Sequence, residues 1–152
     1  MVEETIEEVQ NEIHYNMSKI FTENENAVAA NFELCAYFRE MFKSSETSPV
    51  HQLKKHYPEI YQKVHERQVN ECKVWFIHNI EKGMEQGFYR SETHINDYAN
   101  FYYTLIFQIN ENTVYERDAA ALELKALEYH IRAMATPKGI KELEHQLAQI
   151  HI

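Results

Sequence analysis

The feature that most constrains the fold of this chain is a helical pattern of apolar residues that continues from Pro58 to Gly87. Proline is favoured in the first turn of a helix, and glycine just past its end. A helix between these two residues would be about 44 Å long, at a rise of 1.5 Å per residue. Its main stripe consists of residues three or four positions apart, namely Val69, Cys72, Phe76, Ile80 and Gly83. The pattern predicts one long helix, and few small globular folds need one of that length.

Gly87 and the residues after it predict how this helix ends. Only glycine takes positive φ without a steric penalty, so it favours a left-handed cap, and the next residue then folds back onto the last turn. Phe88 follows Gly87 and suits that contact, while Gly83 stands one turn earlier. We therefore expect the helix to stop here, with Tyr89 and Arg90 just beyond the break.

The same helical period recurs in the rest of the chain. In the first segment, one narrow stripe is formed by Ile6, Val9, Ile13, Met17 and Ile20. Further helices are predicted at 27–42, 48–57, 95–110, from about 113 or 118 to 135, and from 137 onward. No segment alternates with a period of two, which would indicate a strand. The sequence therefore predicts an all-α fold, an antiparallel bundle of about six to seven helices.

With 152 residues the chain has the size of one domain, which we place at 1–152. A domain of this length buries about 70% of the surface that its unfolded chain exposes, so it needs no disulfide. Cys35 and Cys72 fall among apolar residues of predicted helices, which suits reduced thiols in a cytoplasmic protein. The N-terminus is acidic, and no apolar run approaches the ~18 residues that cross a bilayer. We expect neither a signal peptide nor a membrane partner.

The formal net charge is −9, from 24 acidic and 15 basic residues. Affinity for nucleic acid depends mainly on lysine and arginine side chains that displace the counterions of the phosphates. An acidic surface repels the phosphate backbone instead. We therefore expect that these residues do not bind DNA.

The glycine-rich end of the long helix resembles a segment found in the C-terminal domain of the TetR family of transcriptional regulators. Gly83, Gly87 and Arg90 stand as in that segment, with the aromatic pair between the last two. The segment 53–60 is similar to the short helix and Pro-Glu that open the family's long central helix, and 129–139 is similar to the closing region of one branch. The resemblance covers most of the chain.

A complete regulator of the TetR family would begin with a domain that contains a helix-turn-helix, and the signatures of that domain do not occur in this sequence. The segment 1–22 instead resembles the helix that connects such a domain to the ligand-binding domain. The resemblance therefore implies contact with DNA only through a domain that is missing here.

A dimer interface is the first functional expectation. Helix 95–110 carries large apolar groups nearly all round its cylinder, and such a helix must be buried on all sides. In the TetR family the last two main helices form a four-helix interface with the second subunit of a homodimer. By this resemblance the interface would include Phe101, Leu105, Ile109, Leu124, Leu127 and Ile131. The alternative is a helix buried at the centre of a monomer.

A pocket for a small effector is the second expectation. Such pockets are mostly apolar, with a few well-placed polar groups, and often lie between the helices of a bundle. We expect one between helices 27–42 and 58–87, lined by Phe38, Tyr61, His65, Gln68, Cys72, Trp75 and Asn79. Aromatic walls with these polar groups suit a flat or amphipathic ligand. The alternative is that each polar group is simply bonded inside the core or lies at its edge.

Enzymatic chemistry has little support in the sequence. Glu142 and His145 have the spacing of a di-iron ligand pair, but those sites need a second such pair and further glutamates on core helices. No Gly-x-Ser-x-Gly turn or glycine-rich phosphate loop occurs, and both cysteines fall among apolar residues of predicted helices, which suits inert thiols better than reactive ones. We expect no enzyme activity, no cofactor and no metal.

These observations predict the effector-binding and dimerisation domain of a TetR-like regulator, which senses a small apolar or aromatic molecule. Two alternatives remain open. One is a stand-alone helical protein that binds a small molecule, and the other is a metal-dependent enzyme built on a helical bundle.

Overall fold

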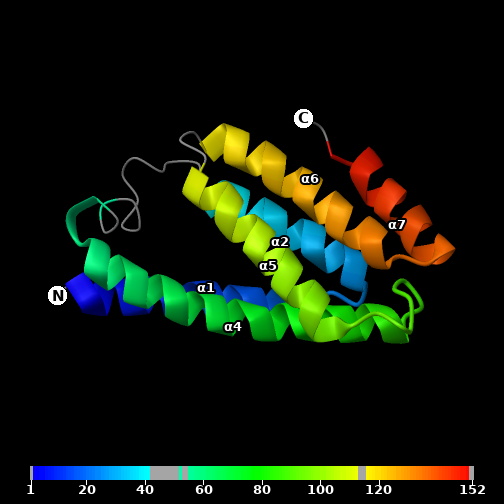
Figure 1. The fold of residues 1–152 in the computed structure, drawn as a ribbon, viewed down its shortest axis with the longest axis horizontal. Coiled ribbons are helices and arrows are strands. Elements are labelled where there is room, and N and C mark those ends of the chain that lie inside the picture. The colour runs from blue at the N-terminus through cyan, green and yellow to red at the C-terminus, as the bar shows by residue number, and fades with distance from the viewer. Residues whose placement is uncertain (1, 42–51, 53–54, 113–115, 151–152) are drawn as a thin grey trace.

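The chain forms a helical bundle in the computed structural model (Figure 1), which describes residues 2–41, 52, 55–112 and 116–150. Its helices are α1 (Val2–Glu23), α2 (Ala27–Met41), α4 (Pro58–Glu85), α5 (Ile95–Asn112), α6 (Glu116–Met134) and α7 (Pro137–Ala148). Within the described residues there is no strand, only an isolated antiparallel bridge between Tyr89 and Ala135. The prediction of an all-α fold is confirmed. Most of the short helix expected at 48–57 lies outside the described residues.

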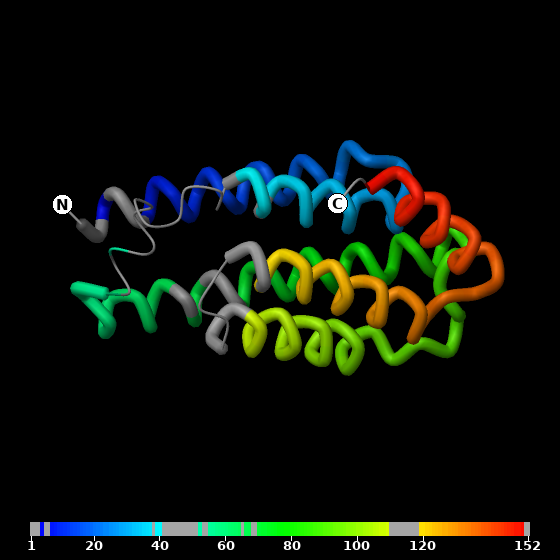
Figure 2. Tube along the Cα trace, turned by 90° about the horizontal axis from the view of Figure 1, so that it is seen from above, coloured from blue at the N-terminus to red at the C-terminus, as the bar shows by residue number. Residues whose placement is uncertain are grey.

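The long helix α4 and the first helix α1 lie side by side along the length of the molecule (Figure 1). The N-terminal parts of both helices extend beyond the remaining bundle, which is also visible from above (Figure 2). α2 contacts α1, α4, α6 and α7 and is therefore the central helix. α5 packs between α4 and α6, and α7 closes the bundle against α2 and α6.

The core is built from the apolar stripe of each helix. On α1, the buried residues Ile13, Met17 and Phe21 recur every four positions, which places them on one face. The largest fully buried side chains come from α1, α2, α4, the segment after α4, α6 and α7, and are Tyr89, Phe21, Met17, Ile80, Leu127, Ile131, Met134, Leu143 and Val28. One continuous core therefore joins both ends of the chain.

The predicted end of α4 is confirmed. Gly87 has a φ of 79°, which is the left-handed region that glycine adopts at lowest cost. Phe88 N donates a hydrogen bond to Gly83 O at 2.9 Å, and Gly87 N donates to Met84 O at 3.1 Å. These two bonds form a Schellman motif. Phe88 is buried in the core, as expected of the apolar residue that follows such a cap.

Gly83 is needed because Tyr89 lies directly against it. A Cβ atom at residue 83 would clash with ring carbons of Tyr89, and this ring is fully buried and has little room to move. The Tyr89 hydroxyl accepts a hydrogen bond from Asn31 Nδ2 at 3.3 Å, and the same amide donates to Asn79 Oδ1 at 2.8 Å. The end of α4 is thus bonded to α2 through a buried polar network.

The segment after α4 is also bonded to the junction between α6 and α7. Arg90 N donates to Met134 O at 2.8 Å, and Thr136 N donates to Phe88 O at 2.9 Å. Thr136 is the N-cap of α7 and accepts a hydrogen bond from Gly139 N through its side chain. A Cβ atom on Gly139 would clash with the carbonyl oxygen of Phe88. The two glycines therefore allow the close approach of three chain segments.

The turn between α1 and α2 is held by the last turn of α4. Lys82 Nζ donates to Asn24 O at 2.5 Å and to Phe21 O at 3.3 Å. Gln86 Oε1 accepts from Ala27 N at 2.9 Å. These bonds satisfy backbone groups at two helix ends, so one end of α4 positions α1, α2 and the α6–α7 junction together.

A histidine is buried between α5 and α6. His130 stacks on Tyr102 with ring centroids 4.2 Å apart and an interplanar angle of 12°. Burial lowers the pKa of His130 to about 3, because the charged imidazolium loses its hydration. His130 is therefore neutral at pH 7 in the folded chain.

Replacing Gly83 or Gly139 by alanine should destabilise the fold. Overpacking of a tight site costs about 1–3 kcal/mol, whereas alanine in an open helix would stabilise it by about 1 kcal/mol relative to glycine. We expect each substitution to lower the free energy of unfolding by about 2 kcal/mol in urea titrations. Lys141→Ala, on the exposed side of α7, is the control and should change little. Higher stability of Gly83→Ala or Gly139→Ala would contradict the proposed close contacts.

The buried His130 should make the fold sensitive to acid. In the unfolded chain, His130 binds a proton near pH 6.5, whereas in the folded chain it stays neutral down to about pH 3. The free energy of unfolding therefore falls as the pH drops from about 6.5 toward 3. Between pH 7 and 5, wild type should lose about 2 kcal/mol more stability than His130→Phe, which keeps the stacked ring. His94→Phe, at an exposed histidine, should retain the wild-type slope in urea titrations. Equal slopes for wild type and His130→Phe would show that His130 titrates normally.

Candidate functional site

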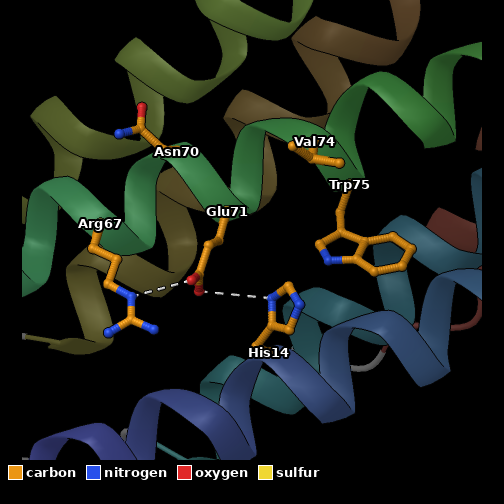
Figure 3. Close-up of a pocket in the computed structure, with 6 residues that line it drawn as sticks. All are labelled: His14, Arg67, Asn70, Glu71, Val74 and Trp75. Carbon is orange, nitrogen blue, oxygen red and sulfur yellow. Dashed lines mark hydrogen bonds and ion pairs between the residues drawn. The ribbon is translucent and has the colours of Figure 1, made fainter.

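An open groove lies between α1 and α4 (Figure 3). Its volume is about 550 Å³, and it is lined by His14, Arg67, Asn70, Glu71, Val74 and Trp75. Five of these residues come from α4 at spacings of three, one, three and one, which places them on one broad face. His14 comes from α1 and reaches the groove from the opposite side (Figure 3).

The bonds that join α1 to α4 position this groove. Gln10 Nε2 donates to Val64 O at 2.8 Å on one side of it, and Lys82 bonds to Phe21 O on the other. Ile13 is buried beside His14, so the next position along α1 is turned toward the edge of the helix pair. α1 is therefore held at both ends of the groove.

The polar side of the groove is a small charge cluster. Arg67 Nε lies 3.3 Å from Glu71 Oε1, and His14 Nδ1 lies 3.7 Å from Glu71 Oε2 (Figure 3). All three side chains are at least one-third exposed. Pairs of this kind contribute only about 0–1 kcal/mol to stability. The cluster can therefore rearrange around a ligand at little cost.

The apolar side of the groove is built around Trp75, the single tryptophan of the chain. Its indole stacks on Phe21 at 6.4 Å between ring centroids, and the rings of His14 and His78 lie 6.0 and 5.8 Å away. Val74 beside it is exposed. The indole Nε1 is buried and has no hydrogen-bond partner within the part of the chain that the structure describes.

The effector pocket was expected between helices 27–42 and 58–87, whereas this groove lies between α1 and α4. Of the seven residues expected there, Trp75 lines the groove. Asn79 is buried in the core, where it bonds to Asn31 and donates to Ala27 O at 2.9 Å. Cys72 Sγ lies 3.7 Å from Met17 Sδ, between α1 and α4. For Asn79, the expected alternative of a polar group bonded inside the core is the one observed.

The other four predicted pocket residues are not placed at the groove. Tyr61 is half-buried on α4 and takes part in interactions of its own. The side chains of Phe38, His65 and Gln68 lie outside the described part of the structure. Their assignment to a ligand site stays a prediction.

Five groove residues were missed by the sequence analysis, namely His14, Arg67, Asn70, Glu71 and Val74. None of the five belongs to the apolar stripes that the sequence shows on α1 and α4. The adjacent pair Val74 and Trp75 was the available signal, because two large apolar residues beside the main stripe indicate a second apolar surface on α4.

The second candidate surface is the outer side of α5 and α6. Phe101 is 66% exposed and Tyr129 is 72% exposed, and Leu105 and Leu122 are exposed as well. Within the described residues, the predicted interface positions Leu124, Leu127 and Ile131 are buried in the core instead, and Ile109 is half-buried against it. Their burial within one chain means that α6 presents Leu122 and Tyr129, and not these three residues, to the outside.

These four exposed side chains share one face. Tyr102 and His130 stack on each other and so mark the seam between α5 and α6. Phe101 and Tyr129 each precede a seam residue and are turned from it by about 100°. Because α5 and α6 run antiparallel (Figure 1), both turn to the same side. Leu105 lies one turn after Phe101, and Leu122 lies two turns before Tyr129, so both lie on this side as well. We call Phe101, Leu105, Leu122 and Tyr129 the α5–α6 face.

Other predicted features have simple structural roles. Cys35 and Cys72 are free and half-buried, and burial raises the pKa of both thiols to about 12. Glu142 Oε1 accepts a hydrogen bond from Gln146, and His145 bonds to Gln149. In the described ranges, no three His, Cys, Asp or Glu side chains converge in a way that could hold a metal ion.

None of the described helices is both long enough and apolar enough to span a membrane. No protein-family model, curated protein or solved structure matches this chain. The family resemblance therefore stays a prediction.

Proposed function

We propose that this chain is a homodimeric, ligand-sensing domain of a TetR-like regulator. Two copies associate through the α5–α6 face, and a small molecule binds between α1 and α4. DNA would be contacted by residues outside this sequence, because the chain itself is strongly acidic, with a net charge of −9.

The observation that carries this proposal is the α5–α6 face. Monomeric proteins rarely expose large contiguous apolar patches, and those that do generally use them to bind a partner. Here two aromatic and two leucine side chains are exposed beside the seam between α5 and α6. A second copy offers the same apolar surface, and a twofold axis across the seam would cover both sets at once. The result would be an interface of four helices.

The position of α1 supports a sensing role. α1 contacts α4 and α2, and its outer part extends along α4 beyond the bundle (Figure 2). A ligand between α1 and α4 would act on the helix that is expected to lead toward a DNA-binding domain. It can change that helix only if its affinity differs between two arrangements of α1.

The dimer is tested by adding charge to the α5–α6 face. We expect the wild-type chain to sediment at twice its monomer mass at micromolar concentration. The double variant Phe101→Glu/Tyr129→Glu should weaken association by about 100-fold or more, since buried aromatic residues carry much of the energy of such interfaces. Both side chains are exposed in the single chain, so the variant should still fold.

Tyr15→Glu provides the matched control, because Tyr15 on α1 is 63% exposed and lies on a different surface. This variant should remain dimeric, and circular dichroism should show unchanged helix content in all three proteins. A monomeric wild type, or a double variant that dimerises as well as wild type, would contradict the proposal.

A further inference from the structure

We infer that the groove between α1 and α4 binds a small carboxylate with a flat apolar body, such as an aromatic acid. Its carboxylate would bond to the indole N–H of Trp75, with the cationic Arg67 about two turns earlier along the same groove, and its ring would lie over Val74 and the edge of Trp75. This inference names the ligand class of the proposed sensor. Binding itself does not depend on the proposed function, but its role in regulation does.

Hydrogen-bonding capacity in the groove favours a ligand that carries acceptor atoms. The indole N–H and the arginine guanidinium are donors only. Arg67 uses Nε toward Glu71, and within the described residues its two terminal nitrogens form no hydrogen bond. Glu71 is already shared between Arg67 and His14. Asn70 and His14 can each donate and accept, so Arg67 and Trp75 are the lining residues that offer donors only, and these two suit a ligand that brings acceptors.

The unpartnered indole nitrogen indicates where one acceptor would lie. Less than 1 Å² of the Trp75 Nε1 atom is exposed, and a buried donor without a partner costs about 1–3 kcal/mol. Figure 3 shows this nitrogen at the end of the ring nearer to His14. A ligand oxygen between His14 and Trp75 would supply the missing partner.

Access to this nitrogen requires only a small movement. The His14 side chain is 46% exposed and is held by a 3.7 Å contact with Glu71. Rotation of this ring would open the space between α1 and the indole without disturbing the core. The bonds of Gln10 and Lys82 on either side of the groove would keep α1 and α4 together.

The apolar wall determines the body of the ligand. Val74 is exposed and Trp75 is half-buried, so an aromatic ring placed over them would remove apolar surface from water. Flat rings also stack favourably on indole. A carboxylate attached to one aromatic ring or to two fused rings matches both the polar and the apolar side of the groove.

The experiment uses the single tryptophan as a reporter. A ¹H–¹⁵N correlation spectrum of the full chain contains one indole N–H signal, from Trp75. The probe is 2-naphthoate, with 2-naphthylmethylammonium as the probe of opposite charge. We expect 2-naphthoate to shift the indole signal in a saturable manner and the ammonium probe to shift it much less.

Two variants test the two donors separately, and calorimetry measures the affinity of each variant for 2-naphthoate. Arg67→Met removes the charge and keeps the aliphatic stem, and should weaken binding of 2-naphthoate by about tenfold. Trp75→Phe keeps a ring and removes the N–H, and should weaken it severalfold. Arg132→Met is the matched control, because Arg132 forms the same i,i+4 pair with Glu128 on α6. This control should bind as wild type does.

Three results would overturn the inference. They are an indole signal that does not move at millimolar 2-naphthoate, Arg67→Met binding as tightly as wild type, and tighter binding of the ammonium probe. The oligomeric state of each protein is measured on the same sample. A dimer that does not bind 2-naphthoate would refute the ligand site alone, and a monomer that binds it would refute the proposed dimer alone.

Discussion

The contact between Gly83 and Tyr89 is the constraint on which the rest of the structure depends. It lets a fully buried aromatic ring lie directly on the last turn of α4. The Schellman motif at Gly87 turns the chain back at this point, and the segment after it bonds to α2 and to the α6–α7 junction. The end of α4 therefore fixes the relative position of segments that are 58 residues apart in the chain.

The long helix α4 then relates the two candidate surfaces to each other. One side of it forms the groove with α1, and another side packs against α5, which in turn packs against α6. Phe76 on α4 contacts the Tyr102 ring at 5.1 Å between centroids, and Tyr102 stacks on His130. Packed rings therefore connect α4 to the seam between α5 and α6.

Much of the fold was predictable from local sequence, and the sites were predictable only in part. Pro58 and Gly87 mark the limits of α4 through backbone preferences, and the apolar stripes identify the buried side of α1 and the other helices. A stripe does not show which neighbour covers it, however. Asn79 bonds inside the core instead of lining a pocket, and Leu127 is turned inward while Leu122, on the other side of α6, is exposed. Those differences depend on the rotation of each helix, which is set by tertiary contacts of residues far apart in the chain.

The central claim is that a second copy of the chain covers the α5–α6 face. Isotope-filtered nuclear Overhauser spectroscopy on an equal mixture of labelled and unlabelled chains tests it most directly, because it detects only contacts between copies. The account predicts intermolecular signals between the Phe101 ring and the methyl groups of Leu105 or Leu122. Intermolecular signals from another surface, or none at concentrations where the chain is otherwise well behaved, would contradict it.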